Sequence, residues 1–242
     1  MNDVEGLERA TLAAVPPEAQ DEIGGWLVGL DHGTVGRAHS AAPLAHAAPA
    51  AGSVAAVEDR YARFGLPAVF RLPDVPAFAQ VQEQLQRRGY RPGKPTLVQL
   101  ASLRDVPVPT DSTVRLATTP ESGWEQVFLG EGFDPVDGAS RLAILRRARE
   151  SLFASIEREG ATVAVGSACF SHGWCGVHGM RTLPAARKQG AAGSILVAFA
   201  QEARARGLER AFLQVEEANA IAQSLYARLG FATAWRYRYW AR

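Results

Sequence analysis

The sequence has little lysine, little cysteine and almost no net charge. Lys94 and Lys188 are its only lysines, and 26 basic residues against 25 acidic ones leave a formal net charge of +1. With basic and acidic residues so closely balanced, we do not expect the clustered basic surface that non-specific electrostatic binding of nucleic acid requires. Cys169 and Cys175 are the only cysteines, too few for a disulfide framework and at a spacing that fits no usual zinc pattern. A reducing compartment is the simplest context for them.

Long apolar runs are also missing, since no stretch approaches the roughly 20 residues that cross a bilayer. The N-terminal segment MNDVEGLERA is polar and acidic, unlike a secretory signal. With 47% hydrophobic and 21% charged residues, the 242-residue composition is that of a globular chain with one large or two small domains. We expect a cytoplasmic protein, monomeric or homodimeric, with no membrane or nucleic-acid partner.

The histidines give no sign of a metal site. His32, His39, His46 and His172 show no ligand spacing with one another, and metal-binding histidines normally recur at short, regular intervals or join cysteines. We therefore expect no metal cofactor.

The second half of the chain has the alternating pattern of an α/β segment. Apolar residues recur at helical spacing in 190–206 and 219–229, and short strand-like runs bounded by turn residues surround them. A helical region is predicted over 120–151, broken near 132–138. The predicted strands cover 113–117, 152–157, 161–170, 174–183, 210–215 and 235–240.

Two segments interrupt these patterns. Residues 39–56, rich in Ala, Pro, Ser and Gly, are predicted to form an irregular connection within the first half. Residues 104–111, with two prolines among short polar residues, are predicted to form an inter-domain linker. This divides the chain into a first domain, 1–103, and a second domain, 112–242.

The two halves share a spacing of glycines. Gly65 and Gly207 each follow a predicted helix and precede a strand, and they lie 142 positions apart. Gly89 and Gly230 end the next helix of each half and lie 141 positions apart. An offset that changes by only one position through helix, strand and helix suggests an internal duplication, although helix–Gly–strand units also recur by chance in α/β proteins.

The stretch TLPAARKQGAAG, residues 182–193, carries the strongest chemical signal, because it runs from a predicted strand into a helix. The free N–H groups of a helix start can hold a phosphate, small residues at 190–193 let the backbone approach it, and Arg187 and Lys188 add charge. A Walker A loop and a Gly-x-Gly-x-x-Gly fingerprint are both absent. A nucleotide-binding protein is therefore disfavoured.

The segment Arg187-x-x-Gly190-x-Ala192 resembles the pyrophosphate-binding motif of the GNAT superfamily, the acyl-CoA-dependent N-acyltransferases. The resemblance covers roughly residue 112 to the C-terminus. The other matching positions, in the family's order, are Thr182-Leu-Pro184, Asn219, Tyr226 and Gly230-Phe231.

The first half lacks the Arg-x-x-Gly-x-Gly/Ala motif and has Leu85 where the second half has Tyr226. It resembles a shortened, degenerate GNAT copy in a tandem arrangement. Such a copy should neither bind CoA well nor catalyse, and its expected work is to cover the second domain and shape the acceptor cleft.

The resemblance implies two GNAT-like domains of α/β (α+β) class, each with a mixed, mostly antiparallel central sheet flanked by helices. It implies that the second domain transfers the acetyl group of acetyl-CoA, the co-substrate, to a primary amine by direct attack in a ternary complex. The acceptor is open: a small molecule, a peptide or a protein. The alternative is a non-catalytic acyl-CoA-binding or regulatory module, although pure binding would need no acid for the leaving thiolate.

The resemblance also assigns roles to residues. The backbone of Met180, Arg181 and Thr182 would pair with the pantetheine arm, and an N–H there would stabilise the oxyanion. Asn219 would hydrogen-bond the pantetheine or a carbonyl near the acetyl group, and Tyr226 would protonate the departing thiolate. The pyrophosphate would lie against Arg187, Lys188, Gln189, Gly190, Ala191, Ala192 and Gly193.

The general base is left open by the sequence. Many family members carry Glu four residues before the Thr182 position, where this chain has His178. By strand alternation His178, Met180 and Thr182 would share one face, and a neutral imidazole titrates in a useful range. A packing histidine with a water relay is the alternative.

Four acidic residues complete the set of candidates. Glu216 and Glu217 follow a predicted strand and are the second choice for the base, with solvated charges at a strand end as the alternative. Asp134 and Asp137 lie where the family's substrate-covering helices would be, and we consider them for attracting a cationic amine.

Overall fold

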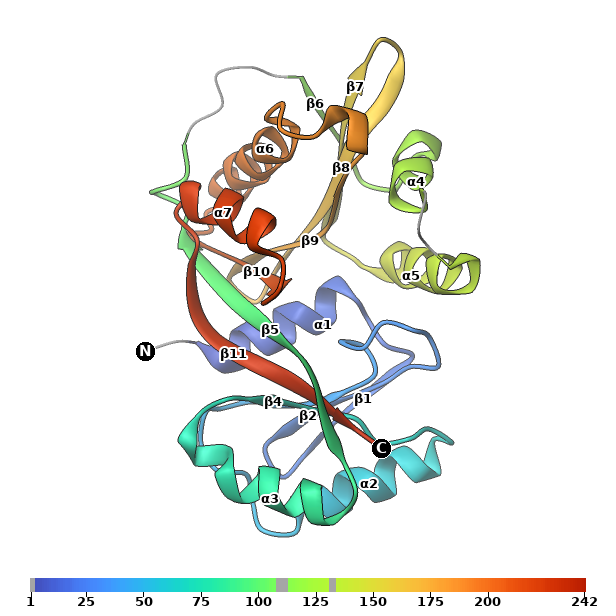
Figure 1. Ribbon diagram of the computed structural model, residues 1–242, viewed down its shortest axis with the longest axis vertical. Coiled ribbons are helices and arrows are strands. Elements are labelled where there is room, and N and C mark those ends of the chain that lie inside the picture. The colour runs from blue at the N-terminus through green and yellow to red at the C-terminus, as the bar shows by residue number, and fades with distance from the viewer. Residues whose placement is uncertain (1–2, 108–112, 131–133) are drawn as a thin grey trace.

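The computed structural model describes residues 3–107, 113–130 and 134–242 (Figure 1). Both halves alternate helices and strands, which the periodicity predicts for the second half. The elements in chain order are α1 (Val4–Ala14), β1 (Ala19–Ile23), β2 (Trp26–Leu30), β3 (Ala41–Pro43), α2 (Ser53–Arg63), β4 (Phe70–Pro73), η1 (Pro76–Phe78), α3 (Ala79–Arg87), β5 (Arg91–Ser102), β6 (Val114–Ala117), α4 (Ser122–Phe128), α5 (Pro135–Arg147), β7 (Ser151–Arg158), β8 (Ala161–Ser171), β9 (Trp174–Thr182), η2 (Pro184–Ala186), α6 (Ala191–Ala205), β10 (Arg210–Glu216), α7 (Ala220–Arg228) and β11 (Ala232–Ala241).

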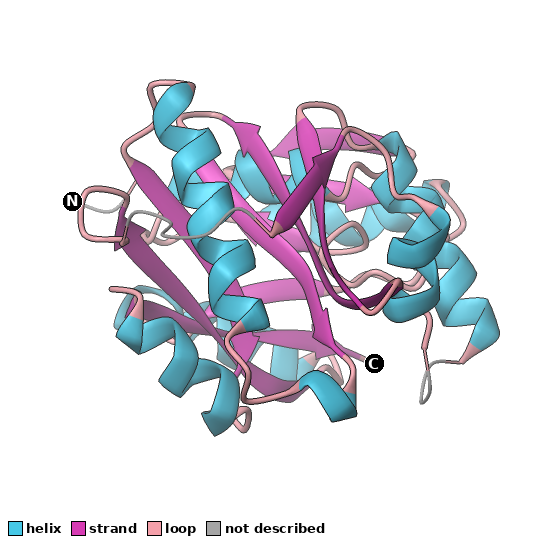
Figure 2. Cartoon of the chain, turned by 90° about the horizontal axis from the view of Figure 1, so that it is seen from above, coloured by secondary structure: helices cyan, strands magenta, loops and turns pink. Residues whose placement is uncertain are grey.

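One sheet runs through both halves of the described chain, in the order β1-β2-β3-β4-β11-β5-β10-β9-β8-β7-β6. Its neighbours are antiparallel except for two parallel pairs, β3 with β4 and β9 with β10. Helices lie on both faces of the twisted sheet (Figure 2). The predicted mixed, mostly antiparallel sheet flanked by helices is confirmed.

The last strand of each half is inserted into the other half. β5 pairs with β10 from Arg210↔Ser102 to Glu216↔Thr96, and on its other edge it pairs with β11. β11 in turn pairs with β4. In Figure 1 these two long strands cross from the middle of the molecule, near α7, into its lower part beside α2 and α3. Strands of both halves therefore form one shared sheet.

Part of the predicted linker packs against the second half. The Arg204 guanidinium of α6 donates from Nε to the Leu103 carbonyl at 2.8 Å, and it also contacts the carbonyl of Val106, which is buried. Residues 108–111 of the predicted linker lie outside the described residues. The division into domains stays a prediction.

The two parallel pairs are built alike. α2 connects β3 to β4, and α6 connects β9 to β10. Each helix starts at a glycine with positive φ, Gly52 at +77° and Gly190 at +84°, a conformation that glycine adopts without the steric cost of a Cβ. The prediction of an irregular connection over 39–56 is wrong at both ends, because β3 and the start of α2 fall within it. Three buried residues, Ala-Ala-Pro, are too short a run to show alternation.

Helix α1 joins the halves. Its N-cap Asp3 accepts hydrogen bonds from Trp174 Nε1 at 3.2 Å and Arg210 Nη2 at 3.0 Å, both in the second half. Leu7 of α1 packs in one buried cluster with Phe212 and with other residues of β5, β9, β10 and β11. The N-terminal helix of the first half thus covers the sheet of the second half beside β9.

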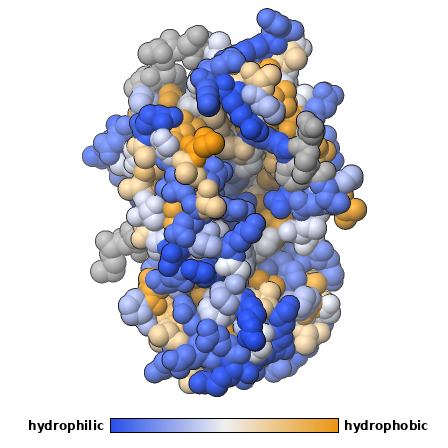
Figure 3. All heavy atoms as spheres, viewed as in Figure 1, coloured by the Kyte–Doolittle hydropathy of each residue, from blue (hydrophilic) through white to orange (hydrophobic). Residues whose placement is uncertain are grey.

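The outside of the molecule is mostly hydrophilic on the face shown in Figure 3, with apolar side chains scattered between charged ones. Among the described residues, Val136 and Ile221 are the most exposed large apolar side chains, at 73% and 84%. Across the described ranges we find no helix whose length and hydropathy would let it cross a bilayer.

Candidate active site

The sheet splits between β9 and β10. The parallel pairing of these strands covers only Cys175–Val177 against Ala211–Leu213. Beyond it, β9 stays on β8 as far as Thr182↔Ala164, and β10 stays on β5 as far as Glu216↔Thr96. Among the described strands, the edge of β9 after Val177 therefore has no partner and borders a gap in the sheet.

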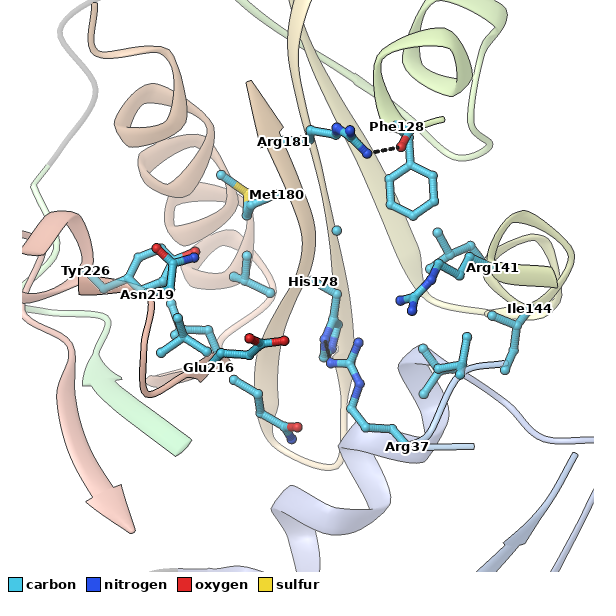
Figure 4. A pocket seen from close by; sticks show the side chains of 18 residues that line it. Arg37, Phe128, Arg141, Ile144, His178, Met180, Arg181, Glu216, Asn219 and Tyr226 are labelled. Atoms are coloured by element: carbon cyan, nitrogen blue, oxygen red, sulfur yellow. Dashed lines mark hydrogen bonds between the residues drawn. The ribbon is translucent and has the colours of Figure 1, made fainter. Parts of the chain in front are cut away.

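A cavity of about 410 Å³ lies in this gap, within the size range of small-ligand sites. Figure 4 shows side chains from both halves pointing into it. The first half contributes Val15, Val35 and Arg37 to the lining. The lining residues are Val15, Val35, Arg37, Phe128, Arg141, Ile144, Leu145, Val177, His178, Gly179, Met180, Arg181, Leu213, Gln214, Val215, Glu216, Asn219 and Tyr226.

A β-bulge in β9 sets the direction of the side chains that border the gap. Gly179 has φ +61°, and the register with β8 shifts between Val165 and Ser167. A Cβ at Gly179 would lie 3.3 Å from both Ser167 Oγ and a Phe128 ring carbon, so the bulge favours glycine on two grounds.

The bulge places His178 and Met180 on opposite faces of the sheet. The Met180 thioether packs with the α6 side of the core, over Gly166, whereas the His178 ring lies edge-to-face on Phe212 on the α1 side. The prediction that these residues share one face is wrong, because the extra residue of a bulge reverses strand alternation.

His178 is 5% exposed and accepts a hydrogen bond from Arg37, with Nδ1 2.7 Å from Arg37 Nη1. A guanidinium only donates, so Nδ1 carries the lone pair and Nε2 carries the proton. Nε2 is buried and has no hydrogen-bond partner among the described residues. Burial, and secondly the Arg37 charge, hold the pKa of His178 well below 6.5. The imidazole is neutral with its lone pair engaged, a poor arrangement for a general base.

Tyr226 borders the cavity from α7. Its side chain is 9% exposed, and burial raises the pKa of the phenol, so the proton stays on the oxygen at neutral pH. The hydroxyl forms no hydrogen bond with any described residue. Asn219 caps α7, its Oδ1 accepting from Ala222 N at 3.1 Å, which leaves the amide NH₂ available. Both residues lie on the α7 side of the pocket in Figure 4.

The loop before α6 presents backbone donors to open space. Lys188 and Gly190 have φ of +60° and +84°, and the helix has no side-chain cap. The first N–H to bond within the turn is that of Ser194, which donates to the Gly190 carbonyl at 3.0 Å. The N–H groups of residues 190–193 have no acceptor in the described chain. A Cβ at Gly190 would meet nothing within 4 Å.

Other predicted residues are partly engaged within the protein. The Arg181 guanidinium turns toward α4, donating to Phe128 O at 2.9 Å and Gly130 O at 3.2 Å. The Gln189 side chain donates to Ala185 O at 3.0 Å and accepts from Arg158 Nη1. Arg187 donates from Nε to the Thr182 carbonyl at 3.3 Å. These contacts hold the loop against the ends of β7 and β9.

The four acidic candidates differ in whether they line the cavity and in their partners within the protein. Glu216 lines the cavity and forms no ion pair with a described residue, whereas Glu217 pairs with Arg236 at 3.2 Å. Asp134 caps α5, and Asp137 accepts from Arg141 at 2.8 Å. Neither aspartate lines the cavity, so the structure gives no support to their attracting a cationic amine.

The sequence reasoning missed three arginines at the site. Arg37 and Arg141 line the cavity, and Arg158 contacts the loop through Gln189. They lie far apart in the sequence and belong to no motif. Only the fold brings them to the second half's cleft. Among the described residues no cluster of three or more His, Cys, Asp or Glu side chains is placed to hold a metal ion.

Residues 2–240 match the family described as "Probable histone acetyltransferase Rv0428c C-terminal". The chain belongs to this family. It is also 26% identical over 246 residues to "Uncharacterized N-acetyltransferase YobR" of Bacillus subtilis, with 99% of this chain and 98% of the relative covered. The protein is a GNAT-type N-acetyltransferase, so the enzyme class predicted from the motifs is confirmed.

Solved structures described as GNAT proteins share the fold over the length of this chain. A GCN5-related N-acetyltransferase from Kribbella flavida superposes with a TM-score of 0.70 at 18% identity, covering 100% of this chain and 96% of the other. A tandem GNAT protein from the clavulanic acid biosynthesis pathway gives a TM-score of 0.60 at 14% identity, covering 100% and 95%. At these identities the likeness concerns the fold alone.

Proposed function

We propose that the protein transfers the acetyl group of acetyl-CoA to a primary amine by direct attack in a ternary complex, using the cleft of the second half. The observation that carries the proposal is the split between β9 and β10. Within the part of the chain that the structure describes, the split leaves one strand edge without a partner. A helix start with free N–H groups and a tyrosine hydroxyl without a hydrogen-bond partner lie beside it.

The chain's residues fit acetyl-CoA in three places. The free edge of β9 at Met180, Arg181 and Thr182 would pair with the pantetheine amides as an added strand does. The N–H groups of Gln189, Gly190, Ala191, Ala192 and Gly193 would bind the pyrophosphate, favoured by the α6 dipole. Arg187 and Lys188 add positive charge beside that loop, as does Arg158 through its contact with Gln189.

The reaction needs a proton removed from the amine and a proton given to the thiolate. Tyr226 is the proposed acid, because its phenol is protonated, its side chain lines the cavity and its hydroxyl has no hydrogen-bond partner among the described residues. Glu216 is the proposed base, directly or through water, because it is the one described carboxylate in the cavity lining. His178 is proposed to act on Arg37 instead. The Asn219 amide is proposed to orient the pantetheine.

We further propose that residues 1–103 are a degenerate copy of the catalytic domain, joined to it by 104–111. The repeated arrangement of a parallel pair, a helix starting at glycine, and a second helix supports this, as does the likeness to a protein described as a tandem GNAT. Localisation in the cytoplasm and a monomeric or homodimeric state stay predictions.

The test uses purified full-length protein. Calorimetry should show one acetyl-CoA bound per chain, and an amine panel should release free thiol from acetyl-CoA. Two equivalent binding sites would contradict the degenerate first half, and no binding would overturn the proposed donor. Binding without thiol release from any amine would favour the alternative, a non-catalytic acyl-CoA-binding module.

A further inference from the structure

Two arginines converge on the end of the cavity away from the acetyl-CoA loop. Arg37 comes from the segment between β2 and β3 in the first half, and Arg141 comes from α5 in the second half. Their guanidinium groups point into the pocket from different elements in Figure 4. Apolar residues, among them Val35, Phe128 and Ile144, line the same region. Such walls reduce solvent screening and strengthen any pairing of these cations with an anion.

The charge of Arg37 is not balanced by an acid in the described chain. It takes part in no ion pair there, and its guanidinium donates to the neutral His178 ring. Since His178 fixes one Nη1 hydrogen, the remaining donors of the guanidinium are held in a set direction and are available to a ligand. Arg141 does have a carboxylate partner, Asp137, bound through Nε at 2.8 Å.

The other side of the cavity has the opposite charge. Glu216 lies at the end of β10, where the sheet splits, and Figure 4 shows its carboxylate directed into the pocket. An ammonium group is attracted to this side and repelled by the arginine side. A volume of about 410 Å³ admits a small molecule.

We infer that the acceptor is a small amine that also carries an anionic group, a carboxylate or a phosphate, which Arg37 and Arg141 bind while the amine lies on the Glu216 side. This inference rests on the proposed acetyl transfer and names the acceptor class for it. Arg37 makes the first half part of the specificity of the second. His178 is a positioning residue that orients Arg37.

The experiment compares matched acceptors by thiol release from acetyl-CoA with the full-length protein. Amino acids are paired with their C-terminal amides, O-phosphoethanolamine is paired with ethanolamine, and spermidine represents polycations. We expect kcat/KM at least about tenfold higher for the anionic member of the preferred pair, the gain expected of one charge-assisted hydrogen bond. The pair showing the preference distinguishes carboxylate from phosphate, and spermidine should be the poorest substrate.

Arginine variants test whether Arg37 and Arg141 cause the preference for anionic acceptors. Arg37→Gln and Arg141→Gln should each raise KM for the anionic acceptor by about 10- to 100-fold, with little change in kcat or in acetyl-CoA affinity. Neither should raise KM for the neutral partner. Arg146→Gln, on the same helix as Arg141 but outside the cavity lining, is the matched control and should change neither constant.

The outcomes separate the two proposals. If acetyl-CoA does not bind, the proposed function fails and this inference fails with it. If acetyl-CoA binds and the amides, ethanolamine or spermidine are used as well as or better than the anionic amines, acetyl transfer stands and the inference is overturned. It is equally overturned if no anionic amine is acetylated, or if Arg37→Gln leaves KM unchanged.

Discussion

The two halves of the molecule build the same parallel strand pair and use it differently. In the second half, β9 continues five residues past its pairing with β10 and borders a cavity. In the first half, β3 pairs with β4 only at Ala41↔Phe70 and ends at Pro43. A proline has no N–H to offer, so the first half lacks both the long free edge and one of its donors.

The helices that follow show the same contrast. Leu85 on α3 is fully buried among aromatic residues, including Trp26, Phe70 and Phe78. Tyr226 on α7 holds the related position in the second half and faces the cavity. Filling the space with apolar side chains stabilises the fold, whereas leaving it open keeps a polar hydroxyl available for chemistry. The comparison teaches that a repeated architecture does not repeat a site when a few side chains fill it.

Separating the two halves should have the largest effect of all, because it should abolish folding of the first half. A fragment of residues 1–103 lacks β11, the strand between its own β4 and β5, and its uncovered edges invite association. We expect it to be insoluble or unfolded when expressed alone, because a sheet missing a central strand cannot close.

Circular dichroism and size-exclusion chromatography check this expectation. Co-expression of 1–103 with 104–242 is the control and should restore a soluble complex, since each fragment supplies the strand that the other lacks. A monomeric 1–103 fragment with a cooperative melting transition would show that the halves are independent domains.

Tyr226→Phe and Leu85→Ala should affect opposite properties. If the Tyr226 hydroxyl protonates the leaving thiolate, its removal should lower kcat on the order of 100-fold with acetyl-CoA affinity little changed. Leu85→Ala removes a fully buried side chain in the first half and should cost about 2–5 kcal/mol of stability, leaving kcat per folded molecule unchanged.

Kinetics at saturating acetyl-CoA and chemical denaturation measure the two effects. A Phe variant as active as the parent would remove Tyr226 from the mechanism. A large loss of activity in folded Leu85→Ala would contradict the supporting role of the first half.

Gly190→Ala and Gly52→Ala compare the two helix starts. Both glycines have positive φ and open space where a Cβ would stand, so each substitution should cost about 1–2 kcal/mol of stability. Only the Cβ at residue 190 would stand where the pyrophosphate is proposed to bind. We expect acetyl-CoA affinity to fall about tenfold, or roughly 1.4 kcal/mol, in Gly190→Ala alone. Calorimetry measures the affinity. Equal affinities in the two variants would show that the pyrophosphate does not bind at the loop before α6.

Much of the second half could be predicted from local pattern. The strands, the helices over 191–205 and 220–228, and the glycine-rich turn before α6 all follow from periodicity and from turn residues. Their order also carried the family resemblance, since Asn219 and Tyr226 stand at the right distances from the loop.

The features that could not be predicted depend on contacts between residues that lie far apart in the sequence. The bulge at Gly179 reverses the alternation on which the role of His178 was based, and a single glycine in a strand does not reveal it. Arg37 reaches His178 across 141 positions. The exchange of β5 and β11 is invisible in either half alone, because each strand has ordinary alternation and finds its neighbours only in the complete sheet.

The smallest predicted effect is a difference in acid stability that depends on two histidines, one buried and one partly buried. Burial, and then the Arg37 charge, hold the pKa of His178 well below its usual 6.5. Below pH 6.5 the imidazole therefore becomes protonated in the unfolded chain and stays neutral in the native state. The stabilisation is therefore present above pH 6.5 and is lost as the pH falls, by about 1 kcal/mol between pH 6.5 and 5.5. His178→Gln, which keeps a hydrogen-bond acceptor for Arg37, should remove this share of the pH dependence. His46, in the first half, has its pKa lowered by burial in the same direction but is only partly buried, so His46→Gln should change the profile less. Urea unfolding of the three proteins at both pH values measures the slopes, and parallel profiles for parent and His178→Gln would show that the imidazole is protonated in the native state.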